Sequence, residues 1–225
     1  MGKNCKEEYE KMMKEKEELE KPKQDLESKS KPDTNDFIYV PSISLYVAKQ
    51  RTFQNKNWFD CHKELQKNNQ RMLIIPEFIE FLKYLKSSIN SEYLTIYKDI
   101  TEVRDPWRAE WLDADLKVKN KQLYINYNHV LDSNGNLIPK NSELLDEDTL
   151  MKDKKPGISL DEWLDNHTIP GLPTTKTKSG DLYYWCPGDN NSVVGFDADS
   201  ARVGLDCNGG PSFDYSVLGV RGVKK

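Results

Sequence analysis

The stretch "SVVGFDADSARVGLDCNGGPSFDYSVLGVRGV", residues 192–223, combines the periodicity of β-strands with a loop of small polar and aromatic residues. Between 193 and 207 apolar or structural side chains alternate with short polar ones, which is the two-residue period of a strand. The segment 209–215 is rich in Gly, Ser and Asp, and "SVLGVRGV" then resumes a strand pattern. The stretch therefore predicts strands that turn one set of side chains toward the fold and the other set outward.

The same region has a restricted amino-acid alphabet. Residues 186–223 contain no Lys, Glu, Gln, Met or Trp, whereas 58 of the first 185 residues belong to these five types. None of the five has a codon ending in C, and randomising the first two bases of an AAC codon gives every amino acid except them. Two explanations stay open, randomisation of selected codons and chance drift in composition.

The aromatic residues of the loop give a first indication of function. Phe213 and Tyr215 lie among Gly, Ser and Asp, a composition typical of recognition surfaces, where aromatics provide contact area and small polar residues adapt. The alternative is an ordinary loop with one aromatic side chain packed against the fold.

The composition of the whole chain limits the classes of partner. Charged residues make up 31% and hydrophobic residues 36%, and the net charge of -4 offers no basic stripe to a nucleic acid. No apolar run approaches the roughly 20 residues of a membrane span. The N-terminal "MGKNCKEEYEK" lacks the apolar core of a signal peptide. We therefore expect no nucleic-acid partner, no membrane span and no signal peptide.

The N-terminal region differs from the rest of the chain. Thirteen of the first 21 residues are Lys or Glu, and "KPKQDLESKSKPDTND" has the composition of a linker. We expect residues 1–35 to be a charged helix and linker or a disordered segment. As a helix, it could support oligomer formation or docking to a partner. Residues 36–225 are predicted to form one domain.

Two segments carry the spacing of amphipathic helices. Asn57 is a candidate N-cap for the first, and Pro76 suits the first helical position of the second. The apolar faces are Trp58, Cys61, His62 and Leu65 in the first segment and Phe78, Phe81, Leu82 and Leu85 in the second. A capping box, Ser159 with Glu162, predicts a third, short helix in "LDEWLDNH".

The middle of the chain has the pattern of a β-hairpin. Apolar and polar residues alternate over 112–118, "KNK" interrupts them, and the alternation resumes over 123–127. "DSNGN" at 132–136 predicts a further turn. Glu110, Asp113 and Asp115 form an acidic cluster beside Trp111. Paired carboxylates can catalyse proton transfer, but the alternation places both aspartates with Lys117, and we interpret the cluster as a solvated sheet face.

The histidines and cysteines show no metal-ligand spacing. His62, His129 and His167 fall in different elements, and we interpret each as structural or exposed. The four cysteines form no CxxC pair, and we expect reduced, buried thiols, with a bridge between Cys186 and Cys207 left open. The chain also lacks a phosphate-binding Gly-rich loop with its Lys and a GxSxG motif. We therefore predict no metal, no cofactor and no enzymatic activity.

Two parts of the chain carry a resemblance to known families. "NWFDCHKELQKNNQRMLIIPEFIEFLKYL" resembles the two-helix opening of C-type lectin folds and formylglycine-generating-enzyme-like domains. Arg71, Met72, Pro76 and Glu77 hold the matching places, with two extra residues before the proline. "SVLGVRGV" looks like the closing strand of that fold, and with "SVVGFDADSARVGLDCNGGP" before it the end resembles the variable proteins of diversity-generating retroelements. The resemblance covers about 37–87 and 181–223.

This resemblance implies an α+β fold. The implied fold is a C-type lectin-like domain with two helices and a small twisted antiparallel sheet. It would carry a family-specific β-rich insertion at about 88–170 and a variable ligand-binding region at about 188–223. In the family, which occurs in phages, bacteria, archaea and archaeal viruses, a reverse transcriptase copies a template into the 3′ end of the gene with errors at adenines. The scaffold then displays the varied side chains to a ligand. The resemblance implies a diversified receptor-like or adhesion-like protein with a macromolecular ligand, most simply a protein, located in the cytoplasm or carried by a partner on a virus particle or surface.

The resemblance also implies roles for single residues. The displayed, ligand-binding positions are Val194, Asp197, Asp199, Ala201, Gly204, Asp206, Gly209, Gly210, Phe213, Asp214 and Tyr215. The scaffold positions are Phe196, Ser200, Arg202, Leu205, Cys207, Pro211, Leu218, Gly219 and Arg221.

Three alternatives compete with a diversified binder. An enzyme of the formylglycine-generating type would need reactive cysteines together, and Cys186 with Cys207 is the candidate pair. A fixed binding domain on the same fold would explain the restricted alphabet as drift. A calcium-dependent sugar lectin is disfavoured because its Glu-Pro-Asn or Gln-Pro-Asp and Trp-Asn-Asp motifs are absent.

Overall fold

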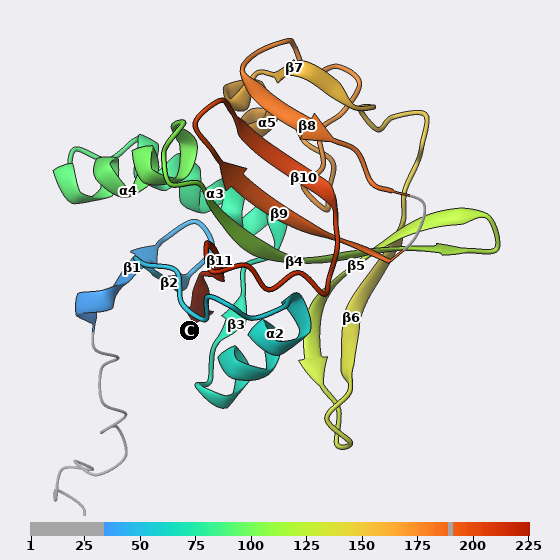
Figure 1. Ribbon diagram of the computed structural model, residues 1–225, viewed down its shortest axis with the longest axis horizontal. Coiled ribbons are helices and arrows are strands. Elements are labelled where there is room, and N and C mark those ends of the chain that lie inside the picture. Colours follow the sequence, from blue (N-terminus) through green and yellow to red (C-terminus); the bar gives the residue numbers. More distant parts are fainter. Residues whose placement is uncertain (1–33, 189–190) are drawn as a thin grey trace, which may run out of the picture. The chain divides into compact units, whose positions relative to one another are not determined.

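Two β-sheets organise the described part of the chain, which comprises residues 34–188 and 191–225 of a computed structural model (Figure 1). The strands of the larger sheet are β4 (Arg108–Lys119), β5 (Gln122–Leu131), β6 (Leu137–Leu144), β7 (Lys154–Ile158), β8 (Leu182–Trp185), β9 (Ser192–Ala198), β10 (Val203–Gly209) and β11 (Leu218–Val220). Their order is β6-β5-β4-β9-β10-β8-β7, and β11 pairs with β4. The β10–β8 and β11–β4 pairs are parallel, and the others are antiparallel.

The smaller sheet joins the start of the domain to its end. It contains β1 (Phe37–Val40), β2 (Leu45–Ala48), β3 (Arg71–Met72) and β12 (Gly222–Lys224), in the order β1-β2-β12-β3. The last residues of the chain therefore lie between two strands from its first third. Arg221, just before β12, donates from Nη1 to the carbonyl of Ala48 at 2.9 Å and fixes this arrangement.

Residues Asp36–Lys225 form one compact unit, separate from Met1–Asn35. A short 3-10 helix, η1 (Thr34–Asp36), lies at the boundary. The charged helix expected in the first residues and most of its linker lie outside the described residues. In the described part of the chain, no helix combines the length and the apolar character that a membrane crossing requires.

The three predicted helices are confirmed. They are α2 (Trp58–Lys67), α3 (Ile75–Lys86) and α5 (Leu160–Asp165). Asn57 caps α2 by accepting a hydrogen bond from the backbone N–H of Asp60 at 2.9 Å, and Ser159 caps α5 by accepting one from Glu162 at 3.3 Å. A fourth helix, α4 (Ser91–Thr101), is not among the predicted elements.

Arg71 and Glu77 fix the start of α3. The two side chains form a bidentate ion pair with N–O distances of 2.6 and 2.5 Å. Glu77 also accepts a hydrogen bond from the backbone N–H of Ile74 at the helix N-cap. These contacts join β3 to α3 directly and set the direction in which the helix leaves the small sheet.

Both predicted turns close hairpins. Asn120 (φ 52°) and Lys121 (φ 65°) are the two central residues between β4 and β5, and two positive φ values are typical of the tight type I′ turn. In the next turn Gly135 has φ 79°, and the Asp132 carboxylate accepts hydrogen bonds from the backbone N–H groups of Asn134 and Asn136. The β4–β5–β6 meander therefore follows from local sequence.

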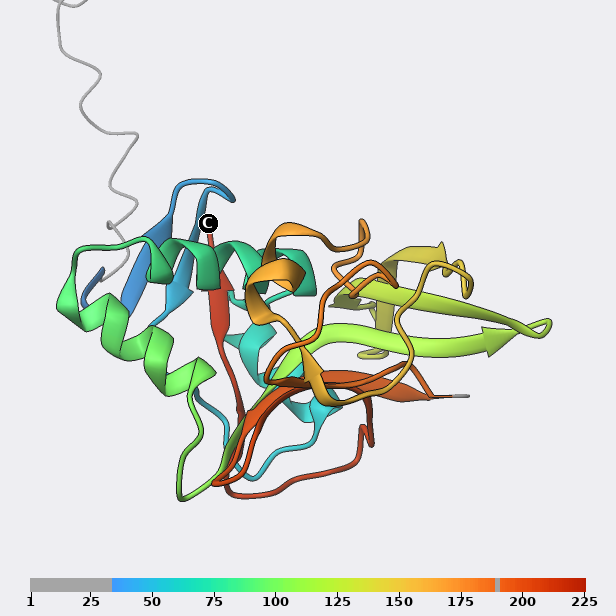
Figure 2. The same ribbon diagram turned by 90° about the horizontal axis from the view of Figure 1, so that it is seen from above.

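The main core lies between the larger sheet and the helices α3 and α5. Phe196 on β9 is at its centre, with its ring 5.2 Å from that of Phe78 on α3 and 6.1 Å from that of Trp163 on α5. Figure 2 shows α3, α4 and α5 on one side of β9 and β10 and the loop before β11 on the other. The sheet therefore has one helix-covered face and one face that the C-terminal loop partly covers.

The architecture is mixed α+β, in agreement with the predicted class, but the details differ from what the resemblance implies. The described residues contain four α-helices and an eight-stranded sheet in addition to the smaller one. The expected insertion at 88–170 includes β4, which pairs with β5, β9 and β11 and is a central strand of the sheet. Residues 108–119 are therefore part of the framework, because they bridge the C-terminal strands and the β5–β6 hairpin.

Candidate ligand-binding face

The outer surface of β8, β10 and β9 presents the polar side chains of the C-terminal strands. In the strand register Gly204 lies opposite both Tyr183 and Asp197, and Asp206 lies opposite Trp185. These residues share one side of the sheet, because Phe196 and the alternate residues of β10 point into the core. We call the surface formed by Tyr183, Trp185, Asp197, Arg202, Gly204 and Asp206 the strand face.

Gly204 lets two side chains approach each other across the strand face. A Cβ atom at this position would lie 2.6 Å from Cζ3 of Trp185 and 2.7 Å from Oδ1 of Asp197. Any larger residue therefore has to displace the indole ring or the carboxylate. Gly204 itself is buried beneath these two side chains, so the prediction that it is displayed is wrong.

Arg202 covers the aromatic side chains of β8. Its guanidinium carbon lies 4.9 Å from the ring centre of Trp185 and 5.6 Å from that of Tyr183, within cation–π range. The two ring centres are themselves 5.8 Å apart, and the ring planes are inclined by 30°. The sequence predicts a scaffold role for Arg202, but its half-exposed side chain is part of the strand face.

The turn between β9 and β10 is closed by Asp199. Its carboxylate accepts hydrogen bonds from the backbone N–H groups of Ala201 at 2.7 Å and Arg202 at 2.9 Å. Asp199 therefore holds the turn, while Ala201 is exposed. Ser200, expected to be scaffold, is exposed at the same turn.

The strand face carries two partly buried carboxylates. Burial and the neighbouring Asp206 raise the pKa of Asp197 to about 6. Burial also raises the pKa of Asp206, against a hydrogen bond that its carboxylate accepts from the backbone N–H of Asn208 at 2.7 Å. Oδ1 of Asp197 has no hydrogen-bond partner within the described residues. The face therefore offers a poorly solvated acidic pair that an approaching cation would stabilise.

The loop before β11 adds an exposed aromatic cluster, formed by Trp107, Phe213 and Tyr215. These side chains are 39%, 46% and 51% exposed. The Phe213 and Tyr215 rings lie 5.5 Å apart, and Tyr215 lies 6.0 Å from Trp107. Asp214 between them is exposed, and Gly210 lies beneath the Phe213 ring, where a Cβ atom would be 2.8 Å from Cζ.

The backbone of this loop is held in place although its side chains are exposed. The carbonyl of Pro211 accepts a hydrogen bond from the backbone N–H of Trp58 at 3.1 Å. The carbonyl of Val217 accepts one from Arg51 Nη1 at 2.5 Å, and the same nitrogen reaches the carbonyl of Ala109 at 2.7 Å. The aromatic cluster is therefore mounted on an anchored loop.

Besides Gly204, two predicted binding positions are not accessible. Val194 is fully buried in the main core, because it shares the inward side of β9 with Phe196. Gly209 is buried beneath Trp111, where a Cβ atom would lie 3.0 Å from the carbonyl oxygen of Val193 and 3.3 Å from Cζ3 of the indole. The prediction is wrong for both residues, since alternation puts Val194 with the core and the indole ring covers Gly209.

Besides Arg202, three residues of the site lie outside the predicted binding set. Tyr183, Trp185 and Trp107 precede the segment with the restricted alphabet. For Tyr183 and Trp185 the sequence holds a usable signal, the strand alternation of "LYYW". It places these two side chains on the face opposite to the buried Tyr184. For Trp107 no local signal exists, because its contact with Tyr215 depends on the chain fold.

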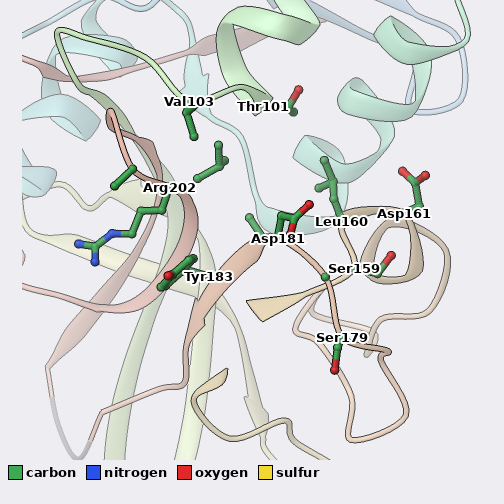
Figure 3. A pocket seen from close by; sticks show the side chains of 13 residues that line it. Thr101, Val103, Ser159, Leu160, Asp161, Ser179, Asp181, Tyr183 and Arg202 are labelled. Atoms are coloured by element: carbon green, nitrogen blue, oxygen red, sulfur yellow. The ribbon is translucent and has the colours of Figure 1, made fainter. Parts of the chain in front are cut away.

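A cleft of about 690 Å³ continues from the strand face toward α4 and α5 (Figure 3). Tyr183 and Arg202 line it at one end, and Ser159 and Asp161 line it at the other (Figure 3). A bound partner could therefore extend a side chain or a short segment from the strand face into this cleft.

The predicted solvated acidic cluster is wrong. Glu110 and Asp113 are fully buried and Asp115 is 6% exposed, because helices or loops cover both sides of β4. Glu110 forms ion pairs with Arg108 at 2.6 Å and with Arg221 at 3.1 Å. Burial opposes its ionisation, but the charges of Arg221 and Arg108 outweigh burial and lower the pKa of Glu110 to about 2. This buried network is structural.

The three histidines belong to different segments, as predicted, but the fold brings two of them together, which the sequence did not indicate. His62 and His129 both lie beside Asp113, with His129 Nδ1 2.5 Å and His62 Nε2 3.7 Å from its Oδ1 atom. His167 lies elsewhere, with Nδ1 2.8 Å from the carbonyl oxygen of Thr168.

The cysteines of the described residues are free. Cys186 and Cys207 are not bridged, and burial raises the pKa of both thiols. Burial likewise raises the pKa of Cys61 to about 12. Thiols in such surroundings are poor nucleophiles at neutral pH.

Comparisons of the chain with protein-family models, with curated proteins and with solved structures gave no match.

Proposed function

We propose that the protein is a ligand-binding protein whose C-terminal segment presents diversified side chains to a protein ligand. In this proposal the scaffold is of the C-type lectin type, and codons of the segment are varied by retroelement-directed mutagenesis at adenines. The strand face and the aromatic cluster together form the binding surface.

One observation carries the proposal. The segment that lacks Lys, Glu, Gln, Met and Trp is also the segment that supplies the exposed loop at 210–215 and the centre of the strand face. Asp197, Asp206, Phe213 and Tyr215 all belong to it, and each is at least partly accessible. Drift in composition would have no reason to coincide with this surface.

The chemistry of the surface supports a protein ligand with basic side chains. Asp197 and Asp206 are carboxylates with little solvation, and three exposed aromatic rings lie in the adjoining cluster. Arginine and lysine can pair with such carboxylates and pack on aromatic faces. Aromatic side chains also provide large contact areas with little loss of conformational entropy.

The framework supports display of varied residues. Glu110 and Arg221 fix β11 and β12 to β4, and Arg51 and Trp58 hold the loop backbone. A backbone that is already ordered lowers the entropy lost on binding. Side chains at accessible positions can then change without rearranging the loop.

The DNA around the gene tests the proposal. We expect a near-identical repeat of the 3′ end, differing only where it carries adenines, next to a reverse-transcriptase gene. Among gene copies from one population, the codons of Asp197, Asp206, Phe213 and Tyr215 should vary. The codons of Phe196 and Leu205, which are neighbours in the same strands with buried side chains, serve as internal controls and should not vary.

A locus with neither repeat nor reverse transcriptase, and with no excess variation at the four codons, contradicts diversification. The same surface would then be the site of a fixed binding domain.

A further inference from the structure

A buried cluster of two imidazoles and a carboxylate lies between α2, β4 and β5. It consists of His62, Asp113 and His129, one from each element. Their nearest ligand-type atoms all lie within 4.8 Å of one another. The exposed fractions are 0%, 0% and 3%, so that solvent does not screen the group.

His62 is the unusual member of the cluster. Both of its ring nitrogens are buried, and neither has a hydrogen-bond partner among the described residues. Its Nε2 atom points toward Oδ1 of Asp113 at 3.7 Å, which is too long for a hydrogen bond. Buried polar groups in proteins are almost always satisfied, so an imidazole of this kind calls for a partner such as an ion.

The other two members are held in a fixed orientation. Asp113 accepts a hydrogen bond through Oδ2 from the backbone N–H of His129 at 3.0 Å, and its own N–H donates to the carbonyl of Leu73 at 2.7 Å. On the far side of the His129 ring, Nε2 lies 3.5 Å from Oδ1 of Asp115. A carboxylate behind a histidine is the arrangement that orients metal-binding imidazoles.

Trp58 forms a rigid apolar wall beside the cluster. Its ring packs edge-on against His62 at 4.3 Å and against His129 at 5.0 Å. The indole N–H donates to the carbonyl of Leu112 at 3.0 Å and fixes the ring. The imidazoles therefore cannot turn away from Asp113 without disturbing the apolar cluster that Trp58 forms with Cys61 and Leu65.

We propose that His62 Nε2, Asp113 Oδ1 and His129 Nδ1 bind one divalent transition-metal ion, with Zn²⁺ as the best fit. Imidazole with carboxylate is a donor set that suits zinc and related ions and does not suit Ca²⁺ or Mg²⁺. Metal–ligand bonds of about 2.0–2.1 Å in a tetrahedral site place ligand atoms about 3.3 Å apart. The His62–Asp113 distance of 3.7 Å is close to this value.

The metal ion takes the place of the proton that His129 and Asp113 share. Their 2.5 Å contact has to open by a little under about 1 Å to reach the tetrahedral ligand spacing. His62 then uses a lone pair that has no other partner in the described structure. The fourth position is left to water.

The consequence of such an ion is structural support for the binding loop. It ties α2 to the β4–β5 hairpin, and the first residue of α2, Trp58, holds the loop through the carbonyl of Pro211. The inference does not depend on the proposed function, since it concerns the framework alone.

The experiment uses the full chain, stripped with a chelator and then offered one equivalent of Co²⁺, both folded and during refolding from urea. Refolding is included because the cluster is buried, so that a metal ion cannot readily enter it in the folded chain. We expect one Co²⁺ per chain, visible d–d absorption of a low-symmetry site, and a higher Tm when Zn²⁺ replaces Co²⁺. A chain that binds no metal under either condition overturns the proposal.

Variants assign the metal to these residues. His62→Leu removes one ligand without removing a hydrogen bond, so the metal-free protein should keep its Tm while its Co²⁺ affinity falls at least tenfold. His62→Gln serves if the leucine variant does not fold. His167→Gln, outside the cluster, is the matched control and should bind as the unchanged chain does. Unaltered Co²⁺ binding by both His62 variants places the metal elsewhere and contradicts the proposal.

Discussion

At the scale of single residues, the ionised carboxylate of Asp197 lowers the stability of the fold at neutral pH. Its carboxyl group has a pKa of about 6 in the fold, against a usual value of 3.8, so the folded state binds the proton more tightly than the unfolded state does. The contribution of Asp197 to stability is therefore most favourable below about pH 4, decreases as the pH rises toward 6, and stays lower above it. A residue that weakens its own fold at neutral pH is typical of a functional surface.

Replacing Asp197 by Asn removes this destabilising negative charge. We expect Asp197→Asn to increase the free energy of unfolding at pH 7.5 by about 1–2 kcal/mol, and to leave it nearly unchanged at pH 4. Urea unfolding at both pH values measures the difference. Asp214→Asn, at an exposed loop position, is the control and should change stability at neither pH. An equal effect of Asp197→Asn at both pH values would contradict the assigned pKa.

Two phenylalanines of the C-terminal segment test the division into buried scaffold positions and exposed positions. Phe196 is fully buried between Phe78 and Trp163, whereas Phe213 is 46% exposed on the loop. Phe196→Ala should lower the free energy of unfolding by about 3–5 kcal/mol, because it leaves a cavity in the core. Phe213→Ala should lower it by under about 1 kcal/mol. Similar losses for the two variants, measured by thermal or chemical unfolding, contradict the division.

At the scale of elements, the sequence predicts what local interactions determine. The helices at 58–67 and 75–86 have a cap or a proline at the start and a complete apolar face, and the β4–β5 hairpin has a turn whose residues tolerate positive φ. The helix at 91–101 is not among the predicted elements although Tyr93, Ile96, Tyr97 and Ile100 have helical spacing. Two members of this stripe are only partly buried tyrosines, so its apolar pattern is weaker than that of the helices at 58–67 and 75–86.

The error on β4 has a different cause. Alternation along a strand shows that its two faces differ in polarity, but it does not show whether a second layer covers the polar face. On β4 that face is covered, and the buried carboxylates of the strand are paired with Arg108, Arg221 and His129, of which only Arg108 is close in sequence. Partners that depend on the fold could not be read from the strand itself.

The ion pairs of Glu110 give the C-terminal strands an acid-sensitive attachment. Its pKa of about 2 in the fold lies below the usual value of 4.5, so its contribution to stability is complete above about pH 4.5 and is lost as the pH falls toward 2. In urea unfolding between pH 6 and 2.5, the free energy of unfolding of Glu110→Gln should fall less steeply with decreasing pH than that of the unchanged protein. Because it leaves two arginines buried without their carboxylate, it should also cost about 3–5 kcal/mol at pH 6. An unchanged pH profile contradicts the role of Glu110.

At the scale of the whole molecule, residues from the first third of the domain shape the surface formed by its last thirty residues. Trp58 and Arg51 hold the loop backbone, and β12 completes the sheet that contains β2. The outward set of strand residues is recognisable from alternation. The additional members of the site, Tyr183, Trp185 and Trp107, require the parallel pairing of β8 with β10 and the position of the loop.

Arg51 is the test of this long-range support, because one guanidinium nitrogen bridges the carbonyls of Ala109 on β4 and Val217 in the loop. Arg51→Gln is too short to reach both. We expect amide hydrogen exchange to increase at least tenfold for residues 214–218, which corresponds to about 1.4 kcal/mol of local stability. Exchange within β9 and β10 should not change, since their ladder bonds do not involve Arg51. Lys63→Gln, an exposed change on α2, is the control. If the amide protons of the loop exchange no faster in Arg51→Gln, Trp58 and the strand contacts of β11 alone hold the loop backbone, and the supporting role of Arg51 is contradicted.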